Sequence, residues 1–253
     1  MQALELKFLL HPQWKSAPEQ REIMMIIDPS VELISFDVWS TLIRPNKEYS
    51  ATRASVVAQG IGWTGDIETA AKALRAACSE LDDQMDRTGK CYNFAPRIDL
   101  TCAKLSLPTI QAGAMAEMER LVMESHRRFP PCLTEPDLLD TLASLCSWGY
   151  KLAVISNTGI TSGETLRALL ADVGILQLIN YELYSDEVGY SKPSSEIFAA
   201  LARMSGVAPE RTLHVGDNRA ADYQGASDSR LHALWYTTKE QGSHVIPELR
   251  QLV

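Results

Sequence analysis

The chain has 253 residues, of which 45% are hydrophobic and 22% charged, with 14 Gly and 12 Pro. This length allows one large domain or a core with a substantial insert, and the composition excludes a disordered, collagen-like or coiled-coil protein. The formal net charge of −8 gives no basic surface for nucleic acid or an anionic membrane, although a local cationic site could still hold an anionic metabolite.

The N-terminal region, residues 1–30, is predicted to be an extension, and residues 1–28 fit no helix or strand. It lacks the basic start and the long apolar stretch of a signal peptide. No apolar run in the sequence approaches the ~18–20 residues that a membrane helix needs. The five cysteines are widely spaced, with no CxxC pair, so we interpret them as reduced thiols and expect a cytoplasmic protein.

Five short apolar segments have the composition of buried parallel strands. They are Val31–Val38, Leu152–Ser156, Leu178–Tyr184, Leu213–Val215 and Leu231–Tyr236. Helical patterns lie between them, and this alternation predicts an α/β fold with a doubly wound parallel sheet. The ligand site of such a sheet lies at the carboxyl ends of its strands.

Two helices are predicted between these strands. The first covers Pro136–Gly149 and follows Thr134 and Asp137, which we interpret as a capping-box-like pair. The second covers Ser195–Met204, and Gly206 is expected to end it. Both place leucine or isoleucine side chains on one face, as helices that cover a sheet do.

Residues 45–129 contain no convincing strand and are predicted to be an all-helical cap inserted into the α/β core. The core then consists of residues 31–44 and 130–253. The helical patterns of the cap cover Tyr49–Gln59, Asp66–Met85, Pro96–Leu107 and Ile110–Arg128. No internal repeat or low-complexity tract is present.

Side chains suited to phosphate chemistry follow four of the predicted strand ends. Asp37 ends the first strand and Ser156 the second, Lys192 precedes a proline, and Asp217 and Asp222 follow the strand that includes Val215. Each residue alone is more often a turn, a cap or a surface charge. Together they bring a carboxylate, a hydroxyl, an ammonium group and a carboxylate pair to one crevice.

In this order the motifs resemble those of the haloacid dehalogenase-like hydrolase superfamily, over about residues 31–44 and 130–237. The resemblance implies a Rossmann-like core with a helical cap and Mg²⁺-dependent hydrolysis of a small phosphorylated metabolite through an aspartyl-phosphate. It also implies that Asp37 is the nucleophile, that the Ser156 hydroxyl binds the transferring phosphoryl group, and that Lys192 is its electrostatic clamp.

The metal site implied by the resemblance consists of Asp37, Asp217, Asp222 and the backbone carbonyl of Trp39, with Thr41 bracing the nucleophile loop. The charges make physical sense without the resemblance. A carboxylate that attacks a phosphate meets like-charge repulsion, so the site needs a hard, oxygen-ligated cation and a lysine on the equatorial oxygens. Carboxylates close to a phosphate are themselves an argument for a bound metal.

The sequence departs from the superfamily at Trp39, where the phosphatases carry a second Asp that protonates the leaving oxygen and then activates water. An indole N–H only donates hydrogen bonds and cannot perform either task. Loss of general acid–base catalysis typically costs ~10²–10⁴ in rate. A cap residue could replace the missing acid, and the candidates are Glu80, Asp82, Asp83, Asp86, Glu124 and His126.

Three other functions stay open. A 2-haloacid dehalogenase also has an aromatic residue at the position of Trp39, but its anionic substrate would be repelled by three carboxylates without a cation. A phosphonate hydrolase with a lysine Schiff base could use Lys47, Lys72, Lys90 or Lys104. A non-catalytic member would bind a phosphorylated metabolite or a protein partner without turnover.

The substrate contacts are expected to come from Asn157, Thr41 and two tryptophans. Trp39 is expected to shape the substrate slot, and Trp63 lies in a glycine-rich turn, Gly60–Gly65, that we interpret as a specificity loop. Tyr92, Asn93 and Arg97 are further candidates. The sequence identifies neither the substrate nor the oligomeric state.

Overall fold

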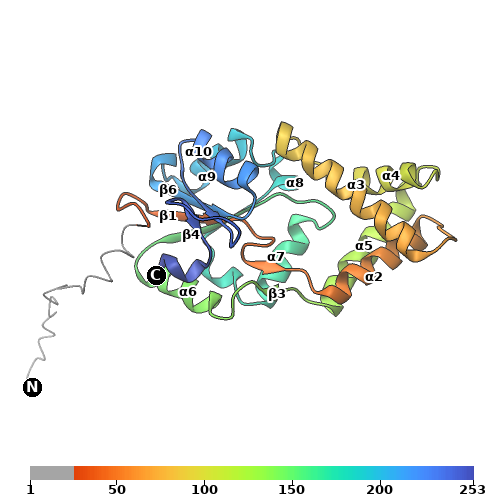
Figure 1. Ribbon diagram of the computed structural model, residues 1–253, viewed down its shortest axis with the longest axis horizontal. Helices are drawn as coiled ribbons and strands as arrows, with labels where there is room; N and C mark the ends of the chain where they lie inside the picture. The colour runs from red at the N-terminus through yellow and green to blue at the C-terminus, as the bar shows by residue number, and fades with distance from the viewer. Residues whose placement is uncertain (1–25) are drawn as a thin grey trace, which may run out of the picture.

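The computed structural model describes residues 26–253, so most of the predicted N-terminal extension lies outside the described residues. Its centre is a six-stranded parallel sheet in the order β5-β4-β1-β6-β7-β8 (Figure 1). The strands are β1 (Leu33–Phe36), β4 (Lys151–Ser156), β5 (Tyr181–Tyr184), β6 (Thr212–Gly216), β7 (His232–Tyr236) and β8 (Val245–Ile246). The predicted α/β class is confirmed.

Helices cover both faces of this sheet because consecutive strand residues point to opposite sides. Ile34 packs in one buried cluster with α6 (Leu138–Ser147) and α7 (Gly163–Asp172). Its neighbour Leu33 packs in another cluster with α9 (Ser195–Ser205) and Ala226 of α10 (Gly225–Asp228). The three-layer arrangement is therefore that of a doubly wound core.

Four helices lie apart from the sheet, in the right half of Figure 1. They share a buried cluster that includes Val57, Leu74, Ile98 and Val122. These helices are α2 (Lys47–Gly60), α3 (Ile67–Thr88), α4 (Phe94–Lys104) and α5 (Ala112–Arg128). We call residues 45–129 the cap below.

Two connections join the cap to the core, and they pair with each other. Strand β2 (Ile43–Arg44) leads into the cap and lies antiparallel to β3 (Cys132–Leu133), which leads out of it. The hydroxyl of Thr134 donates to the carbonyls of Thr41, at 2.7 Å, and Leu42, at 3.2 Å. The return connection is thereby tied directly to the segment that follows β1.

This arrangement corrects the predicted start of the helix at Pro136–Gly149. Helix α6 begins at Leu138, and its N-cap residue Asp137 makes no side-chain capping bond. Thr134 cannot cap the helix because its hydroxyl is bonded to the carbonyls of Thr41 and Leu42. The competing contacts are with residues 93 and 92 positions earlier in the chain, which a local pattern does not reveal.

Other differences concern short or unpatterned elements. The predicted strand Leu178–Tyr184 begins only at Tyr181, because Leu176–Leu178 form a turn of 3₁₀-helix. Helix α7 and strand β8 were not predicted. Among residues 26–253, no helix combines the length and apolar composition that a membrane crossing requires.

Candidate active site

Asp37 lies directly after β1, at the start of a tight loop. The amides of Leu42 and Ile43 both donate to the carbonyl of Val38, at 2.9 and 3.0 Å, and Ser40 adopts a left-handed backbone with φ 63°. The chain therefore reverses direction directly after β1. The loop thus holds the Asp37 side chain at the carboxyl edge of the sheet, in the centre of the strand order.

The Lys192 ammonium group is the hub of the site. Its Nζ donates to Asp37 Oδ1 at 2.7 Å, to Asp222 Oδ1 at 2.6 Å and to the carbonyl of Ile155 at 2.7 Å. All three N–H groups are therefore used. The side chain is only 1% exposed, so these charge-assisted bonds form in a nearly dry environment, where they are strong.

The charges in this cluster shift one another's pKa. Burial alone would lower the pKa of Lys192, but Asp222 and Asp37 outweigh it and raise that pKa above its ordinary value. Burial raises the pKa of Asp37 to about 7, against the lowering effect of Lys192 and together with repulsion from Asp222 and Asp217. Burial and the Asp222 charge likewise raise the pKa of Asp217 to about 6. One ammonium group is therefore not enough to balance three carboxylates.

His214, which the sequence analysis did not single out, contacts the Asp222 carboxylate. Its Nε2 lies 3.2 Å from Asp222 Oδ1, and its Nδ1 lies 2.8 Å from the Ser35 hydroxyl. Burial lowers the pKa of His214, so the ring is neutral. Since an ionised Asp222 only accepts, Nε2 carries the hydrogen and Nδ1 accepts from Ser35. A histidine two residues before a Gly-Asp pair, inside an apolar strand, was the available signal.

Both oxygens of the Asp222 carboxylate accept hydrogen bonds. Burial alone would raise its pKa, but Lys192 and His214 outweigh it and hold the pKa well below its ordinary value. Its Oδ2 accepts from the backbone N–H of Asn218 at 2.9 Å. A Cβ on Gly216 would lie 2.2 Å from the Asp222 carboxyl carbon, so only glycine leaves room for this packing.

The structure shows a positioning task for Asn157, one of the predicted contact residues. The Asn157 amide accepts from the backbone N–H of Lys192 at 2.7 Å and donates to its carbonyl at 2.9 Å. Asn157 thus positions the backbone of Lys192. Its hydrogen bonds do not show the expected contact with the substrate. Ser156 ends β4 beside it, with its hydroxyl at 3.5 Å from the Asn157 carbonyl. The buried Thr41 hydroxyl has no partner among residues 26–253.

The donor set at this edge suits a hard divalent cation. One oxygen from each of Asp37, Asp217 and Asp222 lies within 4.8 Å of the others. The Trp39 carbonyl accepts no backbone hydrogen bond in the described part of the chain. Both Asp222 oxygens are already hydrogen-bonded, so Asp37, Asp217 and this carbonyl are the freer donors. Carboxylate and carbonyl oxygens are what Mg²⁺ prefers.

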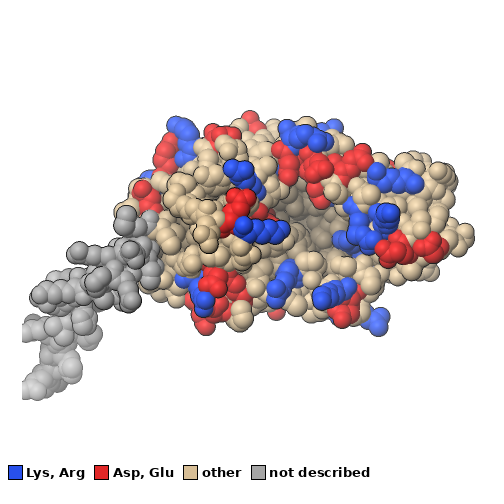
Figure 2. Space-filling model, viewed as in Figure 1, with Lys and Arg blue, Asp and Glu red and all other residues tan. Residues whose placement is uncertain are grey.

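The cap reaches the site at two places on opposite sides of the hollow that Figure 2 shows between the cap and the core. On one side, Trp39 stacks at 6.0 Å on His126 of α5, which in turn stacks at 3.7 Å on Tyr49 of α2. On the other, the end of α3 meets the core: Ser191 donates its backbone N–H to Gly89.

Trp63 is not brought to this site. Its indole N–H donates to the carbonyl of Asp66 within the same turn. The connection between α2 and α3, which contains it, lies at the end of the cap far from the core (Figure 1). Arg97 lies against Gly159, in the loop after β4, but its buried guanidinium is paired with Asp82 of the cap at 2.7 Å.

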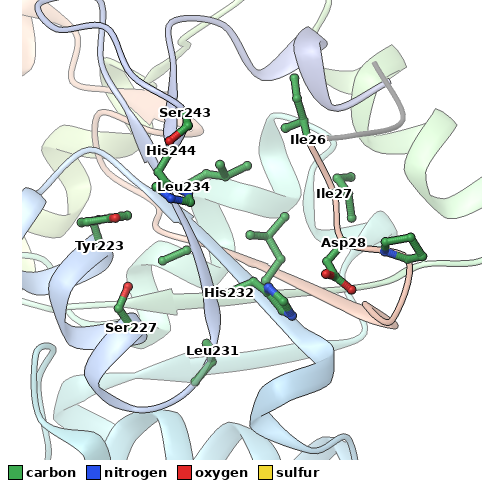
Figure 3. A pocket seen from close by; sticks show the side chains of 13 residues that line it. Ile26, Ile27, Asp28, Tyr223, Ser227, Leu231, His232, Leu234, Ser243 and His244 are labelled. Carbon is green, nitrogen blue, oxygen red and sulfur yellow. The ribbon is translucent and has the colours of Figure 1, made fainter. Parts of the chain in front are cut away.

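A separate cavity of about 590 Å³ lies at the opposite, amino-terminal edge of the sheet (Figure 3). It is lined by Asp28, His232 and His244 among others. The Asp28 carboxylate accepts from the Ser30 backbone and hydroxyl, and His232 Nε2 lies 3.0 Å from the Glu210 carbonyl. Asp28 and His232 are thus hydrogen-bonded locally, and no lining residue belongs to the Lys192 cluster.

Comparison with known proteins agrees with this geometry. A profile of the haloacid dehalogenase-like hydrolase family matches residues 31–229. The chain belongs to this family. The human haloacid dehalogenase-like hydrolase domain-containing protein 3 is 28% identical over 215 residues, which cover 81% of each chain.

Two further similar proteins match different shares of this chain. A glyceraldehyde 3-phosphate phosphatase from Methanothermobacter thermautotrophicus is 38% identical over 99 residues, 39% of this chain and 42% of the relative. The magnesium-bound structure of YfnB, a predicted HAD hydrolase of Bacillus subtilis, superposes with a TM-score of 0.66 and 19% identity. That match covers 88% of this chain and 96% of YfnB, and it supports the fold alone.

Proposed function

We propose that this hydrolase is a Mg²⁺-dependent phosphohydrolase that acts on a small phosphorylated metabolite through a phospho-Asp37 intermediate. The observation that carries the proposal is the Lys192 ammonium group, held between Asp37 and Asp222 at one edge of the sheet. A phosphoryl group on Asp37 would lie against this cation, where charge spreads over the equatorial oxygens. The phosphatase name of a relative supports the same substrate class.

The residues divide the work as follows. The Asp37 carboxylate attacks phosphorus while Lys192 stabilises the equatorial oxygens, and the Ser156 hydroxyl binds the same group. Asn157 and Asp222 act indirectly, because they fix the backbone and the ammonium group of Lys192. Asp37, Asp217, the Trp39 carbonyl and, with less freedom, Asp222 would hold the metal. Bound Mg²⁺ would neutralise the carboxylates and the phosphate, and so remove the repulsion between nucleophile and substrate.

The alternatives fit the structure less well. The lysines that a phosphonate hydrolase would need, Lys47, Lys72, Lys90 and Lys104, are all exposed, and none has the buried setting that makes an amine nucleophilic. A haloacid would meet the carboxylates of Asp37 and Asp217 with only Lys192 to offset them. A non-catalytic protein that binds phosphate would use the same lysine, so turnover is what separates it from the enzyme.

The test is hydrolysis of 4-nitrophenyl phosphate and acetyl phosphate by the purified protein, with Mg²⁺ and with chelator. We expect turnover that requires Mg²⁺ and is lost in Asp37→Asn. Full activity in Asp37→Asn would end the mechanism. If neither phosphate compound is hydrolysed and halide is released from 2-chloropropionate, the dehalogenase function would be favoured. Mg²⁺-dependent binding of phosphate esters without turnover would favour the non-catalytic function.

We also propose a cytoplasmic location, because all five cysteines are unpaired in the structure. Disulfides are rare in reducing compartments. Fluorescence microscopy of a tagged chain tests the location, and export to an oxidising compartment would contradict it.

A further inference from the structure

Expulsion of an alcohol from a phosphate ester requires a proton for the leaving oxygen. The groups nearest to Asp37 do not offer one. Lys192 keeps its proton, because Asp222 and Asp37 raise its pKa against the effect of burial, and the Trp39 indole does not titrate. The leaving oxygen points away from Asp37, because attack and departure are roughly in line. A donor must therefore come from the cap side of the hollow.

Most ionisable side chains of the cap are already occupied. Asp82 is paired with Arg97, Glu80 with Lys104, and Glu124 with Arg120. His126 is 1% exposed, and burial together with Arg53 lowers its pKa to about 4, so at neutral pH its ring holds no proton to give. Asp83 is exposed.

Asp86 differs from these residues in both place and environment. It lies in the last turn of α3, where the cap contacts the core through Gly89 and Ser191. Its Oδ2 accepts from the Asn218 side-chain amide at 2.8 Å. The backbone N–H of the same asparagine donates to Asp222, so one residue connects Asp86 to the catalytic cluster.

The environment of Asp86 favours its protonated form. Burial raises the pKa of its carboxyl above the ordinary value, and the nearby charges of Asp82, Asp222 and Asp83 raise it further, against the lowering effect of Asn218. Asn218 occupies Oδ2 only, which leaves Oδ1 free to carry a proton. A half-buried acid whose pKa is raised in this way is suited to general acid catalysis.

We propose that Asp86 is the general acid and base of this hydrolase, supplied by the cap in place of the acid that Trp39 lacks. The inference rests on the proposed phospho-Asp37 mechanism and deepens it. It also explains why α3 is hydrogen-bonded to the loop that follows β6: the contact delivers the carboxyl group to the reaction.

The proton balance is complete without another reactant. As an Asp37 oxygen bonds to phosphorus, the bond between phosphorus and the leaving oxygen breaks, and that oxygen takes the proton of Asp86. Water then attacks the phosphorus of phospho-Asp37 and gives its proton to the Asp86 carboxylate, and the bond to Asp37 breaks. Phosphate leaves, and both aspartates return to their starting states.

The test compares leaving groups in Asp86→Asn, which keeps an oxygen to accept from Asn218 but cannot transfer a proton. Nitrophenolate leaves unprotonated, whereas the alkoxide of glycerol phosphate does not. With Mg²⁺, kcat/KM reports the steps through departure of the leaving group. We expect it to change little for 4-nitrophenyl phosphate and to fall about 10²–10⁴-fold for glycerol phosphate. Loss of the base should also make phospho-Asp37 accumulate during turnover of the aryl ester.

Two variants serve as controls. Asp83→Asn, one turn earlier on the same helix and exposed, removes only one of the charges near Asp86. It should affect both esters far less than Asp86→Asn does, and to the same extent. Asp86→Glu should restore part of the glycerol phosphate activity. Equal losses on both esters, or no loss on either, would overturn the proposal. If the wild-type protein hydrolyses neither ester with Mg²⁺, the proposed function itself has failed, which is a different result.

Discussion

The carboxyl edge of the sheet and the facing side of the cap contribute polar groups of different kinds. At the sheet edge, Lys192, Asp222 and His214 are buried and bonded to one another. On the cap side, the hydroxyl of Tyr49 and Nε of Arg53 are buried, yet neither has a hydrogen-bond partner within the described chain. Buried polar groups are normally paired, so unpaired ones near a site are suited to a substrate or water. The charged groups of the core are thus fixed by hydrogen bonds, whereas polar groups of the cap, and the Thr41 hydroxyl of the core, are left free for substrate or water.

The largest expected effect comes from breaking the core network with Lys192→Met. This change leaves Asp37 and Asp222 buried together without their cation. We expect a loss of about 3 kcal/mol or more in the free energy of unfolding and at least a ~10²-fold fall in kcat. Urea denaturation and aryl phosphate turnover measure the two effects. Retained activity would show that the buried ion pair is not part of the chemistry.

A second way to break the network leaves its charges in place. In Gly216→Ala the new methyl group would meet the Asp222 carboxyl, which cannot give way because three bonds hold it. A misplacement of about 1 Å is enough to cost ~10²-fold in kcat. Gly242→Ala is the matched control, since its Cβ would lie 3.6 Å from Val245, an ordinary contact. Similar kinetics of both variants would contradict this packing argument.

The contact between core and cap can be tested at Gly159, in the loop after β4. A Cβ there would lie 2.8 Å from Cζ of Arg97, which is itself fixed by Asp82 and by the Tyr92 carbonyl. We expect Gly159→Ala to cost about 1–3 kcal/mol of stability and to raise KM more than it lowers kcat. Gly113→Ala in α5, with open space around it, should be neutral or slightly stabilising. Equal effects of the two variants would show that Arg97 can move to make room for the new methyl group.

The smallest effect concerns His126 of the cap and depends on pH. Burial lowers the pKa of His126 in the folded protein to about 4, whereas in the unfolded chain it is about 6.5. Between pH 6.5 and pH 4 the unfolded chain therefore binds more protons than the folded protein does. Stability from this group is complete above pH 6.5 and is lost as the pH falls, by about 1–2 kcal/mol at pH 5. His126→Gln should make the pH dependence of the melting temperature shallower in this range. An unchanged slope would mean that the ring is protonated in the folded protein.

The sequence revealed the core side of the site better than the cap side, for a physical reason. Asp37, Ser156 and Lys192 could be located because parallel strands bring their carboxyl ends to one edge, whatever the distance along the chain. No comparable rule says which residues of a helical insert face the core. Trp63 was therefore assigned to a specificity loop, although its turn lies at the far end of the cap, and Asp86 was one of six acid candidates.

Residues whose role depends on tertiary contacts were the hardest to assign from the sequence. Thr134 fits a capping pattern but bonds to the carbonyls that follow the nucleophile loop. Asn157 fits a substrate contact but holds the backbone of Lys192. In both cases the local pattern identified a hydrogen-bonding side chain correctly, and only the fold showed which partner it reaches.

The most direct test of the central claim is to look for phosphate on Asp37. The protein is mixed with Mg²⁺ and acetyl phosphate, quenched in acid during turnover, digested and analysed by mass spectrometry. The mechanism predicts a phosphoryl group on the peptide that contains Asp37 and none on that peptide from Asp37→Asn. Rapid turnover with an unmodified Asp37, or full activity in Asp37→Asn, would contradict it.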